Sequence, residues 1–469
     1  MVTPHPSGQP RRPAPALDRH STTIRLHEIL EAKSRLEAAA FALDRRNAVA
    51  DVRAAGPAVP LYGVDGLAHE AHNAFRFKRI YVAPDRGVPF LSSSDIIALR
   101  PEPTNFLSRT KTKRLDELIV REHDVLISRS GTVGNVALAG QCHTGKAASE
   151  DVIRVRCVEP ADAGYVAGFL RGRYGRPQLT GAAYGSVVQH IEPHHLERVW
   201  VPDPGPEERR RLGAEMVEAA QRRDRANDLL DEADRQLRAA LGVSALPAEG
   251  APTRTVRASA LADRFEANYH ASLPAAAEAS LQMAGVQTAR LDTFAEVRAV
   301  TKFRKRVYVE KGGIPMLSSK QLFQVDPVVI KRLAKGAHTR DLPEIALETE
   351  MVLVTRSGTI GKVQIVPPYM DGWTASEHAL RIVIFPGNDA GYLYAWLASG
   401  RGEALIKRHT YGSVIQQIDL DQLASVPVPM LPEGETARIG GLVREANRQR
   451  DLAWHQERAA IAAIEALVA

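Results

Sequence analysis

The feature that most constrains the fold of this chain is an internal repeat. Residues 126–134 read LISRSGTVG, and residues 353–361 read LVTRSGTIG. Residues 184–191 read YGSVVQHI, and residues 411–418 read YGSVIQQI. In both matches the second copy follows the first by 227 positions. A register shared between such distant motifs predicts two modules of one fold.

The repeat continues upstream of these motifs. RIYV at residues 79–82 corresponds to RVYV at residues 306–309 in the same register. PFLSS at residues 89–93 corresponds to PMLSS at residues 315–319 with a shift of 226. The second copy therefore lacks one residue between these two motifs and has one additional residue before residue 353. Loops tolerate such changes of length better than strands or helices do.

Each module is followed by a segment that predicts a long helix, at residues 206–242 and 433–469. Both segments are rich in Ala, Glu and Arg, and their apolar or small residues recur at alternating steps of four and three. This spacing is the heptad seam of helices that pack lengthwise. The predicted seam comprises Leu212, Met216, Leu230 and Leu237 in the first helix, Ile439, Val443 and Ile464 in the second, and the polar residues Arg223 and Arg450 at matching positions.

Because the two seams match, the simplest partner of one helix is the other, in an antiparallel coiled coil. This pairing would relate the modules by a pseudo-twofold axis. It would also hold them apart by roughly 50 Å, the length of a helix of about 33 residues. The alternative is that each helix packs back on its own module.

Inside a module, the apolar patterns predict both strands and helices, so the expected fold class is α+β. The strands are expected at residues 124–128, 152–156, 350–354 and 379–383, and the helices at 22–43, 161–173 and 388–400. The resulting division of the chain is a disordered tail at 1–17, a first module at 18–205, a long helix at 206–242, a second module at 251–432 and a long helix at 433–469.

Composition narrows the functional classes. A formal charge of +6 and a pI of about 9.3 permit a polyanionic partner without proving one. Cys142 and Cys157 are too few for a disulfide framework or a four-thiolate zinc site. No stretch approaches the roughly 18 apolar residues of a membrane span, and residues 1–16 lack the apolar core of a signal peptide. We therefore expect a cytoplasmic protein.

Three segments suggest catalysis, and each lacks something that the chemistry needs. GQCHTGK at residues 140–146 is followed by Ala147 instead of the hydroxyl residue that binds magnesium in a phosphate-binding loop. VPPY at residues 366–369 lacks the Asn with which amino-methyltransferases hold an extruded base. Glu150 and Glu377 have no repeated acid and lysine at nuclease spacing, so a role in capping or in pairing with an arginine is preferred. We predict no catalytic residue, metal or cofactor in this chain.

The repeated Arg-Ser-Gly-Thr turns are suited to recognition. They combine a guanidinium, two hydroxyls and a tight turn, which can present donors to phosphates or to base edges. The candidate residues are Arg129, Ser130 and Thr132 in the first module and Arg356, Ser357 and Thr359 in the second. The alternative is a structural turn whose arginine pairs internally, and repetition alone does not distinguish the two.

Further candidates surround these turns. Gln189 and Gln416, after Tyr184 and Tyr411, carry amides suited to adenine, although a backbone cap is equally plausible. Basic runs at matching positions suit a phosphate-tracking edge, with a solvated face as the alternative. They comprise Arg76, Lys78 and Arg79 in the first module and Lys302, Arg304 and Lys305 in the second. RTKTKR at 109–114 belongs to the first module only, and Lys331, Arg332 and Lys335 to the second.

This order of elements resembles a specificity subunit of a type I restriction-modification system. The resemblance covers nearly the whole chain after the tail. It is carried by the strand leading into Ser-Arg-Ser-Gly-Thr and by Tyr-Gly-Ser-Val followed by Gln and then Val-Pro-x-Pro, at residues 201–204 and 426–429. The family usually shows Glu-Gln where the long helices start, and this chain departs from that pattern at residues 207–209 and 435–438. Residues 263–269 are similar to the usual opening of a second target recognition domain.

The resemblance implies a non-catalytic subunit with two target recognition domains, which binds a bipartite, asymmetric site on double-stranded DNA with one half per module. The paired helices would set the spacer and dock two methylating subunits, which hold S-adenosylmethionine, and in some complexes a translocating nuclease subunit. Two alternatives remain open on the residues alone. They are a stand-alone defence nuclease with duplicated DNA-binding modules and a repeat scaffold that binds only proteins.

Overall fold

The computed structural model describes residues 24–26, 29, 41–183, 189–247, 253–261, 264–300, 306–412 and 416–469. The predicted tail at 1–17 and most of the predicted helix at 22–43 lie outside these residues. Helix α2 (Leu43–Ala55) begins where that predicted helix was expected to end. Leu26, within the range of that predicted helix, is exposed.

The two modules have the same strand topology, as the sequence repeat predicts. A four-stranded sheet has the order β2-β8-β5-β6 in the first module and β11-β17-β14-β15 in the second, and all its pairings are antiparallel. A three-stranded sheet has the order β4-β3-β7 in one copy and β13-β12-β16 in the other. A two-stranded pair, β1-β9 or β10-β18, precedes each long helix.

The strands of the first module are β1 (Ala58–Pro60), β2 (Ala68–Asn73), β3 (Gly87–Leu91), β4 (Phe106–Ser108), β5 (Val125–Ser128), β6 (Val136–Leu138), β7 (Ala147–Ala148), β8 (Val152–Cys157) and β9 (Trp200–Pro202). Those of the second are β10 (Thr288–Arg290), β11 (Ala295–Arg298), β12 (Ile314–Leu317), β13 (Lys331–Leu333), β14 (Val352–Thr355), β15 (Val363–Ile365), β16 (Thr374–Ala375), β17 (Ala379–Ile384) and β18 (Pro427–Pro429). The four predicted strands correspond to β5, β8, β14 and β17.

The shorter helices of the modules also correspond in pairs, α2 with α6, α3 with α8 and α4 with α9. Their bounds are α3 (Pro160–Arg171), α4 (Gly175–Thr180), α6 (Ser272–Met283), α7 (Leu342–Ile345), α8 (Ala390–Ala398), α9 (Gly400–Lys407) and α10 (Leu420–Ala424). Residues 161–173 and 388–400 were predicted to be helical, and α3 and α8 confirm this. The sequence pattern missed α2 because this helix buries few apolar side chains, Ala48 and Val52.

A buried arginine ties the two sheets of each module together. Arg154 of β8 and its counterpart Arg381 of β17 are almost fully buried. Arg154 donates to the carbonyls of Leu118 and Ala148, and Arg381 donates to those of Ile345 and Ala375. Burial lowers the pKa of each guanidinium to about 10. These carbonyl contacts replace the water that each guanidinium loses, so both arginines are structural.

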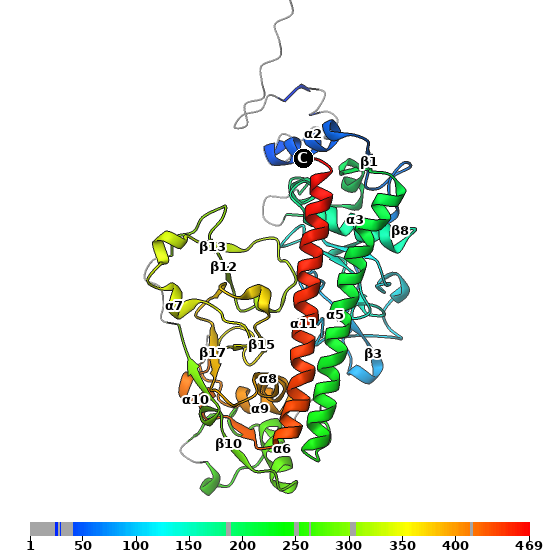
Figure 1. The fold of residues 1–469 in the computed structure, drawn as a ribbon. Helices are drawn as coiled ribbons and strands as arrows, with labels where there is room; N and C mark the ends of the chain where they lie inside the picture. Colours follow the sequence, from blue (N-terminus) through cyan, green and yellow to red (C-terminus); the bar gives the residue numbers. More distant parts are fainter. Residues whose placement is uncertain are drawn as a thin grey trace, which may run out of the picture.

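The long helices α5 (Pro206–Ala240) and α11 (Glu433–Ala466) lie side by side between the modules (Figure 1). They run antiparallel, because Arg438 near the start of α11 contacts Gln236 near the end of α5, whereas Gln456 contacts Glu218 and Arg222. Eight of the nine predicted seam residues are buried, and the ninth, Arg223, pairs with Glu457 of the other helix.

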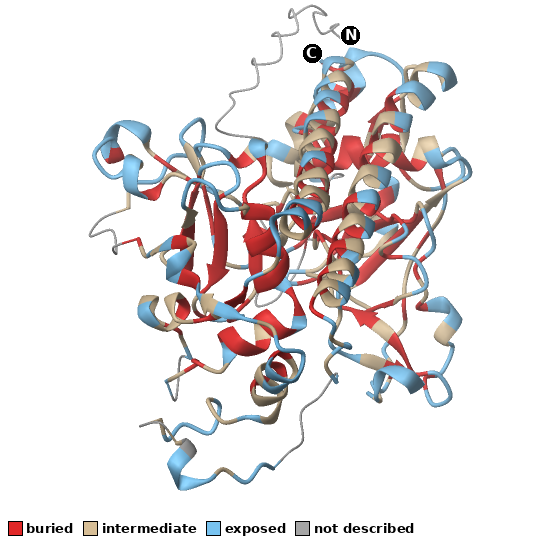
Figure 2. Cartoon of the chain, turned by 60° about the horizontal axis from the view of Figure 1, so that its bottom comes forward, coloured by how far each residue is buried: buried red, intermediate tan, exposed pale blue. Residues whose placement is uncertain are grey.

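Each long helix also packs on its own module, so the two predicted alternatives coexist. Leu212 and Met216 belong to the core of the first module, and Ile439 and Val443 belong to that of the second. Figure 2 shows these buried faces, with exposed residues concentrated in the outer loops. The helices therefore form a shared wall for both cores.

The expectation that the helix pair holds the modules a helix length apart was wrong. Leu99 N donates to Phe323 O at 2.8 Å, and Val325 N donates to Ile97 O at 2.7 Å. The modules therefore touch through their loops, although α3 and α8 pack toward opposite ends of the helix pair. The sequence could not reveal this contact, because backbone groups of loops make it.

Candidate nucleic-acid interface

The repeated turn is built in the same way in both modules. At the end of β5, Ser128 Oγ donates to Thr132 O and accepts from Asn135 N. At the end of β14, Thr355 Oγ1 donates to Thr359 O and accepts from Lys362 N. Gly131 and Gly358 have φ of 72° and 77°, a region that glycine enters without steric cost. The hydroxyl that precedes the arginine therefore closes the turn.

The arginines of the turns pair internally, as the structural alternative predicted. Arg129 contacts Glu192, and Arg356 lies 3.1 Å from the carboxylate of Asp419. Glu192 and Asp419 are 227 positions apart, so both modules carry the same pair. The sequence analysis missed these two acids, although a repeated acid at equivalent positions is a signal that could have found them.

The tip of each turn remains accessible. Thr132 and Thr359 are exposed, whereas Ser130 and Ser357 are largely buried. Ser357 Oγ lies 2.6 Å from Nδ1 of His378. The threonine hydroxyls and the neighbouring glycine backbone are thus the parts of the motif that a ligand can reach.

The structure brings the second repeated motif beside the first. Ile191 N donates to Arg129 O, and Ile418 N donates to Arg356 O. These bonds place the exposed Gln189 and Gln416 next to the turns of their own modules. Tyr411 exchanges backbone hydrogen bonds with Gln417, and burial together with the neighbouring Asp419 raises the pKa of its hydroxyl. The predicted residue Tyr184 lies outside the described part of the chain.

The basic runs form an edge on the three-stranded sheet. Val82 N donates to Phe106 O and Ser108 N donates to Ile80 O, so the segments around 76–82 and 106–114 are adjacent. Along this edge the exposed cationic residues are Arg76, Lys78, Arg79, Arg109, Lys111, Lys113 and Arg114. In the second module Val309 N donates to Arg332 O and Ala334 N donates to Val307 O, which places Lys331 and Lys335 on the matching edge. Lys302, Arg304 and Lys305 lie outside the described residues.

An ion pair connects this edge to the end of the central sheet in each copy. Arg79 lies 2.9 Å from Glu150, and the equivalent Arg306 contacts Glu377. Burial raises the pKa of Glu377, but the hydrogen bond and charge of Arg306 outweigh it, so the pKa is lowered overall. Pairing with an arginine was the role preferred for both glutamates, and the structure confirms it. Of the two arginines, Arg79 was a predicted contact, and its internal pair leaves it less available to a ligand.

An exposed tyrosine stands beside each ion pair. Tyr81 is 46% exposed and its counterpart Tyr308 is 40% exposed. Lys331 lies 5.2 Å from the ring of Tyr308. An aromatic face among cations is suited to a nucleic-acid backbone or to an unstacked base. The sequence analysis quoted these tyrosines only as part of the repeat.

A cleft of about 570 Å³ lies between the modules. The turn at Ser130–Thr132 lines one side, and Arg306, Lys331 and His378 line the other. No carboxylate lines it among the residues that the structure describes. Arg306 is paired with Glu377 behind this lining, so the cleft offers chiefly Lys331 and the hydroxyls to an anion such as a phosphodiester.

The described residues include neither a metal-binding cluster nor a membrane-spanning helix. No group of three His, Cys, Asp or Glu side chains there could hold a metal ion. Likewise, none of the helices in that part of the chain is long and apolar enough to cross a membrane.

The sequence matches no protein-family model, and it matches no curated protein. Among solved structures, it is similar to the type I restriction-modification system S subunit from M. genitalium, with 12% identity, a TM-score of 0.33, and coverage of 87% of this chain and 98% of that one. The HsdS subunit from Thermoanaerobacter tengcongensis has 16% identity, a TM-score of 0.28, and coverage of 87% and 98%.

A third similar chain comes from work on complex assembly and conformational transition of the type I R-M system. It has 14% identity, a TM-score of 0.28, and coverage of 84% of this chain and 93% of that one. These scores describe a coarse likeness of shape, so the function of this chain is argued from its own residues.

Proposed function

We propose that this chain is the specificity subunit of a type I restriction-modification complex, which reads a bipartite site on double-stranded DNA with one half per module. The observation that carries the proposal is the duplication of one candidate interface. Each module pairs a basic, aromatic-bearing edge with an exposed Gly-Thr turn and an adjacent glutamine. Two equivalent surfaces on one chain suit a ligand that presents two similar binding sites, as a duplex does.

The division of labour follows from the chemistry of each group. Lys78, Lys111 and Lys113, with Lys331 and Lys335 of the second module, contact phosphates and provide affinity without sequence information. Thr132 and Gln189, with Thr359, Tyr411 and Gln416, approach base edges, where hydroxyls and amides discriminate. Arg129 and Arg356 serve chiefly to hold the turns, because an acid neutralises each of them.

In the proposed assembly, this chain spaces its two recognition domains and binds the other subunits. The antiparallel helix pair acts as a coiled-coil ruler between target recognition domains at about 18–205 and 251–432, and it docks two methylating subunits. Those subunits carry S-adenosylmethionine, and a translocating nuclease subunit joins complexes that restrict. On this proposal the chain itself catalyses nothing and acts in the cytoplasm.

The test combines binding and methylation. The chain with its methylating partner should bind duplex DNA with an affinity that falls steeply with salt, and Lys111→Ala with Lys113→Ala should reduce the slope of log affinity against log salt by about 2. Lys407→Ala, which removes a single exposed cation from helix α9, serves as the control and should leave the slope unchanged. Sequencing of methylated adenines in cells with and without the chain should reveal one bipartite motif that depends on it. Salt-independent binding and an unchanged methylation pattern would exclude this function.

A further inference from the structure

The contact between the modules is made by equivalent residues around an approximate twofold axis. In the 226 register of this stretch, Ile97 corresponds to Phe323 and Leu99 corresponds to Val325. The bond from Leu99 N to Phe323 O and the bond from Val325 N to Ile97 O therefore map onto each other. A contact of this kind has the geometry of an isologous dimer interface, although both halves belong to one chain.

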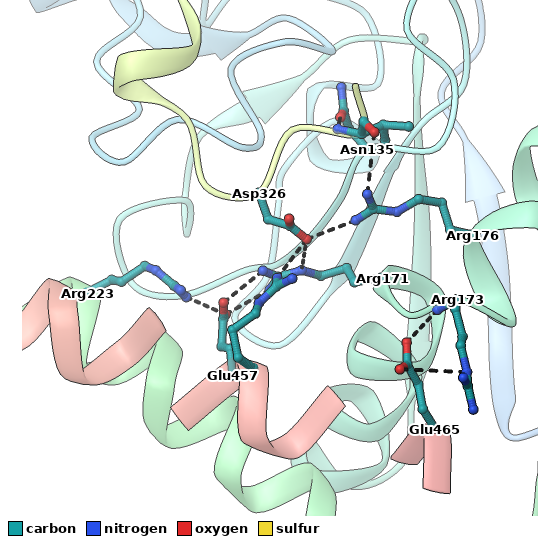
Figure 3. A network of polar contacts seen from close by, with 10 residues as sticks. Asn135, Arg171, Arg173, Arg176, Arg223, Asp326, Glu457 and Glu465 are labelled. Carbon is teal, nitrogen blue, oxygen red and sulfur yellow. Dashed lines mark hydrogen bonds and ion pairs between the residues drawn. The ribbon is translucent and has the colours of Figure 1, made fainter. Parts of the chain in front are cut away.

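The charged residues beside this contact break the symmetry. Asp326 of the second module lies 3.2 Å from Arg171 on α3 and 2.9 Å from Arg176 on α4 (Figure 3). It also lies 2.9 Å from Arg458 on α11. Arg171 also forms a bidentate pair with Glu457 on α11 at 2.8 Å. A carboxylate of one module is thus held by cations from the other module and from the helix pair.

Asp326 and two of these three cations have counterparts of opposite charge in the other copy, whereas the counterpart of Arg171 is the uncharged Ala398. Asp326 corresponds to Arg100, and Arg458 corresponds to Asp231. Arg100 lies 2.6 Å from Asp231, so the same ion pair is made with its charges exchanged. The counterpart of Arg176 is Glu403, which lines a cleft together with Arg100.

We propose that these inverted charges form a heterotypic latch, through which the first module accepts the second module and rejects another copy of itself. Two first modules in the same geometry would place Arg100 of each against Arg176 of the other. Two second modules would likewise place Asp326 of each against Glu403 of the other. Both homotypic contacts bring like charges together near a largely buried junction, where the repulsion is poorly screened.

The latch has a consequence that does not depend on DNA. Twin modules with similar surfaces are prone to pair with the same module of a neighbouring molecule, which leads to dimers or chains of molecules. The exchanged charges direct each module to its partner within the molecule. They therefore favour contact between the two modules of one molecule over contact between equal modules of two molecules.

The first experiment measures closure in the full chain. Ala98→Cys with Gln324→Cys should form an intramolecular disulfide, because these residues form an antiparallel bridge. Asp326→Arg should lower the yield of that disulfide at least fivefold. Adding Arg176→Glu and Arg458→Asp, which copies the charges of Glu403 and Asp231 while Arg171 stays paired with Glu457, should restore it. Asp85→Arg, an equal charge change at an exposed site, should leave the yield unchanged. An unchanged yield in Asp326→Arg, or no recovery in the combined variant, overturns the latch.

The second experiment measures rejection between molecules. A chain with Ala98→Cys and Asp326→Arg has an open latch, and its first modules still repel one another. Adding Arg100→Asp makes the first module complementary to itself, so intermolecular disulfide dimers should increase at least fivefold. The chain with its native cysteines alone reports the background from Cys142 and Cys157. Equal amounts of dimer with and without Arg100→Asp would mean that the charges do not select the partner.

Discussion

At the scale of single residues, comparison of the two copies distinguishes side chains that stabilise the fold from those that face solvent. Arg154 and Arg381 make the same buried carbonyl contacts in both copies, and the turn arginines Arg129 and Arg356 pair with equivalent carboxylates. In contrast, Gln189 is exposed and makes no contribution to either core. Residues that repeat and are internally satisfied define the module, and those that repeat while exposed remain candidates for binding.

Glu457 shows how a single residue can break the repeat. Its counterpart is Leu230, a buried apolar residue. The carboxylate of Glu457 is buried as well, but it contacts both Arg171 and Arg223. Burial alone would raise the pKa of Glu457, whereas the two arginines outweigh burial and lower it to about 2. The helix pair is therefore joined to the first module by a charge that the other half of the molecule lacks.

We expect Glu457→Gln to lower the free energy of unfolding by about 3 kcal/mol at pH 7, because it removes the buried carboxylate that the buried Arg171 and the half-buried Arg223 share. The lowered pKa means that the carboxylate contributes fully above about pH 4.5 and that this contribution is lost as the pH falls toward 2. The difference in stability between the two proteins should therefore shrink over this range. Urea titrations at pH 7, 4 and 3 measure it, and a constant difference would show that the ion pair is not the cause.

At the scale of elements, close packing of helices depends on glycine pairs. Gly164 of α3 faces Gly213 of α5, and the equivalent Gly391 of α8 faces Gly440 of α11. A Cβ atom on Gly164 would lie 2.2 Å from Gly213 O, and one on Gly391 would lie 2.4 Å from Gly440 O. Both long helices therefore approach their own modules at backbone distance, which fixes the angle at which each module leaves the pair.

Neighbouring glycines of α11 provide a matched test of this packing. A Cβ atom on Gly440 would lie 2.1 Å from Oδ1 of Asp389, which caps α8 by accepting from Tyr392 N. Gly440→Ala should destabilise the protein by about 1–3 kcal/mol, because the cap must move. Gly441→Ala meets nothing within 4 Å and should stabilise α11 by up to about 1 kcal/mol through its higher helix propensity. Thermal unfolding compares them, and equal effects would argue against backbone-distance packing.

At the scale of the whole molecule, the two modules form one closed body with two candidate reading surfaces. The helix pair, the loop contact and the charges around Asp326 fix their relative position. The spacing of two half-sites would then be set by the closed junction together with the helices. The spacing of the half-sites would therefore depend on the loop contact as well as on the length of the helix pair.

Exchanging residues 56–205 for the first module of a related chain, with Arg171 and Arg176 retained, should change one half of the methylated sequence. The reason is that the turn, the glutamine and the basic edge of each surface belong to one module, although the first turn also faces Lys331 of the second module across the cleft. The unexchanged half of the motif serves as the internal control. Mapping of methylated adenines measures the outcome, and a change in both halves would show that the modules do not read independently.

The sequence by itself determined the duplication, the long helices and the class of the fold. Periodicity and repetition record which faces are buried, and those signals are local or recur at a fixed interval. For the same reason the sequence located the turns, because glycine at positive φ and a closing hydroxyl are needed within a few residues.

Only the tertiary structure decided which side chains meet. The pairing of Arg129 with Glu192, the contact between Leu99 and Phe323 and the cluster around Asp326 join residues far apart in sequence. The sequence pattern around a charged residue does not indicate which residue it pairs with. Likewise, the sequence of a loop does not indicate which backbone groups it contacts. These interactions fix how the modules sit on the helices, and that arrangement follows from packing in three dimensions.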